Sequence, residues 1–223
     1  MGDEGPIALA RLDELTRRLR RDCPWDRAQD ARSIVSHTVE EAYELADAAH
    51  RDDDAKLLDE LGDVLFQVHF LALLLEERGA GDLTAVAGHV TEKLIRRHPH
   101  VFGDAQAESP EAVRANWDEI KRTTEGRGAE GLFGDVPENL PALSLAAKTQ
   151  RRTGGAPDAA DAITRAAELL RALEALPEPG ERFDALGELL FALVGCARAL
   201  DVDPELALRQ ATTRFRERAE SQR

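Results

Sequence analysis

The sequence predicts an all-α protein, and three observations support this prediction. Alanine and leucine are abundant, alternating runs of β-branched residues are absent, and apolar residues recur at spacings of three and four in every long segment. Such spacing lines apolar side chains along one face of a helix. We therefore expect amphipathic helices that pack into bundles.

The expected helices follow one another along the 223 residues with few long interruptions. The first carries Leu12, Leu15 and Leu19 at helical spacing, and the fourth ends in a basic segment just before Pro99. All are defined by the same apolar periodicity, and they cover residues 7–21, 31–50, 54–78, 82–97, 110–124, 139–152, 158–175, 181–200 and 204–220.

The third expected helix contains the most apolar segment of the chain. From Val64 to Leu75 it reads VLFQVHFLALLL, so it is apolar nearly all round and should form the buried centre of a bundle. Only a short connection around Arg51 to Asp54 joins it to the preceding helix, which makes the two helices antiparallel neighbours. Two helices cannot cover this segment, so partner helices must come from the other repeat, described below, or from another chain.

Two breaks divide the later part of the chain. Glycines 126, 128, 131 and 134 together with Pro137 indicate an irregular connection, and Thr153 to Pro157 form a second break. We expect a catalytic domain over residues 1–125, a linker and connecting helix over 126–157, and a C-terminal domain over 158–223.

Composition excludes some classes of partner. The net charge of −14 argues against nucleic acid or an anionic membrane surface as the main partner, because both require a cationic surface. The longest uninterrupted apolar run, Phe70 to Leu75, is too short to cross a bilayer. Cys23 and Cys196 form no disulfide framework or metal-binding pair, so we expect a reduced, cytoplasmic setting.

Two acidic pairs stand out on the second and third expected helices. Glu41 and Glu44 are three residues apart, as are Glu60 and Asp63, so each pair shares a helical face bordered by apolar residues. Buried carboxylates require either bound metal or basic partners, and hard divalent ions prefer oxygen ligands. We hypothesise a magnesium site; the alternative is that the acids only solvate a helix face.

EEAYE at Glu40 to Glu44 and ELGD at Glu60 to Asp63 contain the two acidic pairs. These segments match the EExxE and ExxD motifs of the MazG family of nucleoside triphosphate pyrophosphohydrolases, which the sequence resembles. Further similar segments occur in the family's order, namely CPWD at 23–26, GDVLFQVHF at 62–70, RRHPHVF at 96–102, WDEIK at 117–121 and LPALSLAAKTQRR at 140–152. The resemblance implies a MazG-like helical bundle that hydrolyses nucleoside triphosphates to the monophosphate and pyrophosphate.

The resemblance also implies the site. Mg²⁺, with Mn²⁺ as an alternative, would be held by four carboxylates, those of Glu41, Glu44, Glu60 and Asp63. Glu40 and Glu41 would act in catalysis, Glu40 by orienting a water or a neighbouring group, because it lies about 100° round the helix from Glu41.

The same resemblance implies which residues contact the substrate. Three cations near the end of the fourth expected helix would bind phosphates, namely Lys93, Arg96 and Arg97. Trp117 and Lys121 of the WDEIK segment would lie near the nucleotide. Arginine forks suit phosphate oxygens. The alternatives are that the cations offset a helix dipole and that Trp117 is a core residue. Family members assemble as dimers, so a homodimer is expected.

The second half of the chain echoes the first. DELGDVLFQ at 59–67 corresponds to DALGELLFA at 184–192, so Ala185 replaces Glu60 and Glu188 replaces Asp63. No EExxE precedes this copy at a matching distance. We predict a two-repeat bundle whose C-terminal copy is degenerate and contributes packing, dimer contacts or regulation.

The expected function is house-cleaning of nucleotide pools. One alternative is a pyrophosphatase specific for dUTP or for a modified nucleotide, since related all-α enzymes share the ExxE and ExxD pattern. The other is a non-catalytic helical regulatory protein whose acids bind structural cations or a basic partner. A di-iron bundle is disfavoured, because the ExxH pairs it requires are missing.

Overall fold

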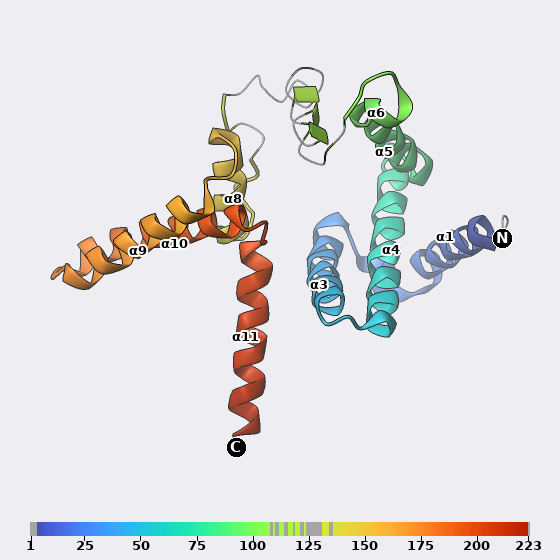
Figure 1. The fold of residues 1–223 in the computed structure, drawn as a ribbon. Coiled ribbons are helices and arrows are strands. Elements are labelled where there is room, and N and C mark those ends of the chain that lie inside the picture. Colours follow the sequence, from blue (N-terminus) through green and yellow to red (C-terminus); the bar gives the residue numbers. More distant parts are fainter. Residues whose placement is uncertain are drawn as a thin grey trace. The chain divides into compact units, whose positions relative to one another are not determined.

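A computed structural model describes most of the chain, namely residues 4–107, 109, 112–113, 116–117, 119–120, 123, 131–133 and 136–222. The regular elements of these residues are helices, which confirms the all-α prediction (Figure 1). Their bounds are α1 Glu4–Asp22, α2 Pro24–Ala28, α3 Ala31–His50, α4 Asp54–Glu77, α5 Leu83–Arg97, α6 Pro99–Phe102, α8 Ala142–Thr153, α9 Ala159–Ala175, α10 Pro179–Ala199 and α11 Pro204–Ser221.

The chain forms two compact units, Met1–Trp117 and Asp118–Arg223. The helix expected over residues 110–124 falls largely outside the described residues. The expected domain limits at residues 125 and 157 stay predictions, as does the two-repeat arrangement.

Side-chain caps fix where the first-unit helices begin. Asp30 accepts hydrogen bonds from the backbone N–H groups of Arg32 and Ser33, and the Ser33 hydroxyl reciprocates on the Asp30 backbone, so a capping box starts α3. Asp53 caps α4 through the N–H of Lys56. Between these helices Asp52 adopts a positive φ of 53°, which closes the turn of the antiparallel hairpin.

Helix α4 is the centre of the first unit. It packs against α3, α1 and α5, and Figure 1 shows α3 and α1 flanking it. Ile34 of α3 meets Phe70 and Leu74 of α4 in a buried cluster joined by Phe66 and Leu71. This core confirms that the apolar segment is largely buried and places the two acidic pairs on neighbouring helices.

The second unit is built around another antiparallel hairpin, α9 with α10. Helix α8 packs against α10 and α11. Helix α10 begins two residues earlier than the periodicity predicts, because Pro179 occupies its first turn, where the missing N–H costs no hydrogen bond. The core of the unit is small and rich in alanine, including Ala147, Ala162, Ala166, Leu189 and Val194.

No helix in the described ranges is both long enough and apolar enough to span a membrane.

Candidate functional site

Three of the four predicted metal ligands converge in the α3–α4 hairpin. Glu41 of α3 and Glu60 and Asp63 of α4 each offer a carboxylate oxygen, and these three oxygens lie within 4.8 Å of one another. Glu60 is 3% exposed, Glu41 is half-buried and Asp63 is exposed. The group therefore runs from the hairpin interior to the surface, open to solvent on one side.

Glu44, the fourth predicted ligand, is linked to this group through a lysine. Lys56 donates a hydrogen bond of 2.6 Å to Glu60 Oε1, and its Nζ lies 3.5 Å from Glu44 Oε2. An ionised carboxylate as buried as that of Glu60 requires a nearby positive charge, and Lys56 supplies one here.

The carboxylates also act on one another. Burial raises the pKa of Glu41 above its ordinary value, and the negative charges of Asp63, Glu44 and Glu60 raise it further. The hydrogen bond to Glu60, followed by the negative charges of Glu60 and Glu44, raises the pKa of Lys56. The hairpin thus gathers more negative charge than one lysine neutralises.

The donor chemistry of this group fits a hard divalent cation. Convergent carboxylate oxygens are the ligands that Mg²⁺ and Mn²⁺ prefer, and mutual repulsion among them is relieved by an added cation. One turn beyond Asp63, Gln67 is 7% exposed and its Oε1 has no hydrogen-bond partner among the described residues. This amide adds another oxygen to the same side of α4.

Glu40 lies outside the convergent group. Its carboxylate is largely exposed, and its Oε2 is 3.3 Å from Nδ1 of His37. The His37 ring in turn faces Trp25 of α2, with ring centroids 5.9 Å apart. Glu40 is therefore positioned by an α2–α3 contact and not by the acids of α4.

The predicted substrate residues gather at a different place. Lys93, Arg96 and Arg97 lie at the C-terminal end of α5, and Figure 1 shows α5 and α6 beside the C-terminal half of α4, whereas the hairpin turn lies at the opposite end. Within one chain, the structure thus keeps this basic helix end apart from the acidic group.

Trp117 lies beside this basic helix end. His98, which caps α5, stacks edge-on against its ring with centroids 5.0 Å apart. The indole Nε1 of Trp117 is buried and has no hydrogen-bond partner among the described residues. Lys121, the last predicted substrate contact, lies outside the described residues.

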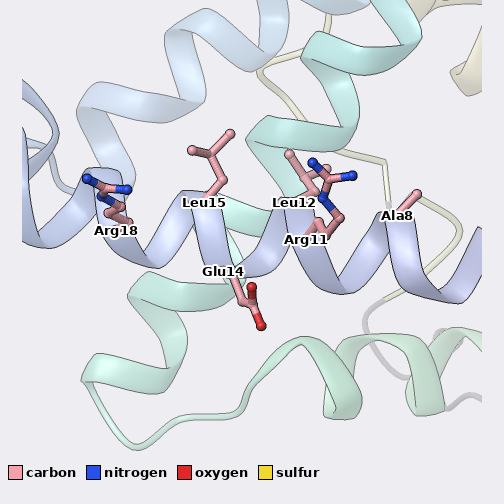
Figure 2. Close-up of a pocket in the computed structure, with 6 residues that line it drawn as sticks. All are labelled: Ala8, Arg11, Leu12, Glu14, Leu15 and Arg18. Atoms are coloured by element: carbon pink, nitrogen blue, oxygen red, sulfur yellow. The ribbon is translucent and has the colours of Figure 1, made fainter.

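Two of the larger surface hollows among the described residues lie in the first unit. One of about 670 Å³ adjoins the acidic group and is lined along α4 by Lys56, Asp59, Gly62 and Asp63 among others. The other, of about 490 Å³, is lined along α1 by residues that Figure 2 shows on a single helix. The α1 hollow is lined by two arginines, one glutamate and apolar side chains, and it brings no group of carboxylates together. The hollow along α4 is therefore the candidate site.

Lys56 is the site residue that the motifs did not reveal. Its spacing of four from Glu60 is a detectable signal, because lysine and glutamate at i and i+4 share a helix face. That the same ammonium also reaches Glu44 on another helix depends on the tertiary fold and is not visible in the spacing.

Comparisons with known proteins agree on one family. Residues 29–102 match the MazG nucleotide pyrophosphohydrolase domain. A nucleoside triphosphate pyrophosphohydrolase of Escherichia coli is 37% identical over 94% of this chain and 85% of its own length. A nucleoside triphosphate pyrophosphohydrolase/pyrophosphatase MazG of Thermotoga maritima is 38% identical over 96% of this chain and 85% of its own.

A crystal structure of a mazG-related protein from Thermotoga maritima matches 51% of this chain and 98% of that chain, with 29% identity and a TM-score of 0.45. The family domain matched over residues 29–102 contains the whole α3–α4 hairpin and its acidic group. With two relatives more than 30% identical over most of both chains, the protein belongs to the MazG family of nucleotide pyrophosphohydrolases.

Proposed function

We propose that this protein hydrolyses nucleoside triphosphates between the α and β phosphates, in a reaction that depends on Mg²⁺ and gives the monophosphate and pyrophosphate. The observation that carries the proposal is the convergence of Glu41, Glu60 and Asp63 to within 4.8 Å inside the matched family domain. The names of the relatives, which are nucleoside triphosphate pyrophosphohydrolases, support the reaction class.

Glu41, Glu44, Glu60 and Asp63 would hold the metal. When bound, Mg²⁺ would supply an acidified water and neutralise the charge that develops on the phosphates. Lys56 lies between Glu60 and Glu44 and pairs with both carboxylates. Burial of Glu60 fixes its orientation, and exposure of Asp63 keeps one side of the group open to substrate.

Glu40 is proposed to orient the attacking water. Its carboxylate is exposed and is held by His37, so it can accept a proton from a water at the edge of the acidic group. Trp25 packs against His37 and helps to fix its imidazole. The CPWD segment thus acts through His37 on Glu40.

The working enzyme is proposed to be a homodimer. Apolar side chains at helical spacing remain exposed on α4 of the single chain, namely Leu58, Leu61, Leu65 and Val68 with exposures of 75%, 49%, 37% and 38%. Val86, Val90 and Leu94 form a similar exposed stripe on α5. A second copy that packs on these stripes would remove them from water.

A second copy would also complete the site. Lys93, Arg96, Arg97 and Trp117 lie toward the far end of α4 from the acidic group of their own chain. We propose that the basic helix end of one chain contacts phosphates held at the acidic group of the other, with Trp117 near the nucleotide. Lys121 is assigned the same role on the family motif alone.

The proposed substrate range is broad, in keeping with a house-cleaning role in the cytoplasm. Contacts made through metal and triphosphate are common to all nucleotides, so recognition by the acidic group does not depend on the base. A dUTP-specific or modified-nucleotide-specific enzyme would need additional contacts to the base.

Product analysis tests this proposal. Purified protein with Mg²⁺ and a panel of canonical, deoxy and modified triphosphates should release pyrophosphate and the monophosphate from many of them. Glu60→Gln should lower turnover by about 100-fold or more, because it removes a buried ligand charge. Glu14→Gln, an exposed glutamate of α1 outside the acidic group and the α4 hollow, is the matched control and should retain activity.

Three results would count against the proposal. Release of inorganic phosphate in place of pyrophosphate would refute the α–β bond assignment. Activity that persists in Glu60→Gln would refute the site. Turnover of a single base alone would refute the broad range and favour the specialised enzyme.

A further inference from the structure

The second unit contains a hollow that the proposed reaction does not use. It has a volume of about 480 Å³ and lies where the end of α8 meets α9 and α10. Its lining includes Arg165, Leu169, Glu188, Phe191, Gly195 and Arg198. The volume lies within the range of about 300–1,000 Å³ that is usual for small-molecule sites.

This hollow overlaps the place in its hairpin that corresponds to the acidic group of the first, since its lining includes Leu169 and Glu188, the counterparts of Glu44 and Asp63. In the first hairpin α3 ends at His50 and α4 begins at Asp54, and in the second α9 ends at Ala175 and α10 begins at Pro179. Each position in the second hairpin lies 125 residues after its counterpart. The same shift separates the repeated segments at 59–67 and 184–192. The shared shift supports the predicted repeat and gives a residue-by-residue correspondence between the hairpins.

Under this shift the charge of the site is changed. Arg165 stands where Glu40 stands in the first hairpin, and Leu169 stands where Glu44 stands. Glu188, the counterpart of Asp63, keeps an acid at its position, and Asp161 is a second acid in this lining. Ala166 and Ala185 stand where Glu41 and Glu60 stand, so the described residues of the second hairpin gather no group of three carboxylates like that of the first.

Arg198 supplies a second positive charge to the hollow. Its Nη1 donates to Gln150 Oε1 at 3.2 Å and its Nη2 donates to the Gly154 carbonyl at 3.3 Å, and both acceptors are neutral. Burial and the nearby charge of Arg151 lower the pKa of Arg198. A partly desolvated cation with neutral acceptors and a like-charged neighbour is stabilised by an anion.

The rest of the lining suits a flat ring. Phe191 exposes 44% of its surface and lies among apolar neighbours that include Ala162, Leu169 and Pro157. Asp161 and Glu188 add carboxylates that can accept hydrogen bonds from hydroxyl or amino groups. Two cations, an aromatic face and two acceptors together match a phosphate, a base and a sugar.

We propose that this hollow binds a nucleoside monophosphate without metal, with its phosphate at Arg198 and Arg165 and its ring against Phe191. The choice of a nucleotide rests on the proposed function, of which the monophosphate is a product. A triphosphate suits the hollow less well, because it carries more negative charge than a monophosphate while the lining offers it the same two arginines beside two carboxylates.

Calorimetric titration of the full-length protein with GMP and UMP in EDTA tests the proposal, since EDTA removes the metal that the first unit would need. We expect saturable binding of one nucleotide per chain. Arg198→Met should weaken this binding about tenfold or more, because a charge-assisted contact is lost. Arg165→Gln should also weaken it, and since Arg165 is exposed this variant leaves the packing intact.

Two control variants locate the binding. Arg171→Gln, an exposed arginine of α9 outside the lining, should bind as the unmodified protein does. Glu60→Gln should bind equally well, although its turnover is expected to be lost. Binding in EDTA is therefore measured independently of catalysis, and failure of either proposal can be recognised separately.

Several outcomes would overturn the inference. These are absence of binding in EDTA, binding that Arg198→Met and Arg165→Gln leave unchanged, and loss of binding in Glu60→Gln. Competition by inorganic phosphate as strong as that by GMP would show a phosphate site without nucleoside recognition, and would likewise refute it.

Discussion

Glu60 shows how the hairpin holds a charge that its burial opposes. Glu60 is 3% exposed. The positive charge beside its carboxylate is the ammonium group of Lys56, which donates a hydrogen bond to it. Motif spacing predicted Glu60 as a ligand, and the structure places it with Glu41 and Asp63. What spacing did not predict was the lysine that bridges Glu60 to Glu44 on another helix.

Removal of the bridging lysine should increase the response to metal. In Lys56→Met the acids lose their protein cation, so the metal-free protein should unfold at a lower temperature, and added Mg²⁺ should raise its Tm by more than it raises that of the unmodified protein. Lys56→Arg, which keeps the charge, is the control. Equal shifts in all three proteins, measured by scanning calorimetry, would show that Lys56 and metal do not share a site.

Glu41 should make stability depend on pH in a definite direction. Its pKa is raised above 4.5 in the folded protein, first by burial and then by Asp63, Glu44 and Glu60. The folded state therefore holds this proton more tightly than the unfolded state, and the resulting stability is complete below pH 4.5 and is lost as pH rises through the raised pKa. Metal affinity should rise over the same window, because the proton must leave.

Thermal unfolding from about pH 4 to about pH 7 measures this effect, over the range in which a raised carboxyl titrates. In EDTA the Tm of the unmodified protein should fall relative to that of Glu41→Gln as pH rises, and Mg²⁺ should diminish the fall. Parallel curves in EDTA would contradict the crowding of carboxylates at Glu41.

The α3–α4 hairpin was predictable as an element because its signals are local. Asp30 and Asp53 cap the two helices, and the apolar spacing of α4 defines its buried face. The contact between α1 and the segment around α2 was not predictable from local signals. It depends on Arg20 of α1, whose partners are distant in the sequence or are backbone carbonyls. Arg20 forms two hydrogen bonds to Glu77 of α4 and donates to the carbonyls of Asp26 and Gln29.

Arg20 should therefore hold the start of α3 in place. Arg20→Met should lower the free energy of unfolding by about 2 kcal/mol, the size expected when charge-assisted hydrogen bonds in a partly buried position are lost. It should also lower turnover, because Gln29 directly precedes the cap of the ligand-bearing helix. Arg21→Met, whose arginine pairs with Asp22 at the surface, is the control; equal denaturation midpoints for the two variants would refute the role of Arg20.

The complete molecule joins two units, and their helical nature followed from composition and periodicity. Assembly did not follow in the same way, because exposure of a stripe such as Leu61, Leu65 and Val68 is a property of the folded chain. The placement of the basic end of α5 away from the acidic group likewise required the structure. Both features lead to the proposal of a site shared between two copies.

Mixing two inactive variants tests a shared site. Glu60→Gln lacks a metal ligand and Lys93→Ala lacks a phosphate contact, so each alone should be inactive or nearly so. A refolded mixture should recover about a quarter of the unmodified activity, because half of the dimers are mixed and each mixed dimer contains one intact site. No recovery, or a light-scattering mass of one chain, would contradict the shared site.

The most direct test of the account is a crystal of the full-length protein grown with Mn²⁺ and a non-hydrolysable nucleoside triphosphate. Anomalous scattering should place manganese among Glu41, Glu44, Glu60 and Asp63, with the triphosphate beside it. Manganese bound elsewhere, or a nucleotide bound while these four carboxylates contact neither metal nor phosphate, would contradict the account.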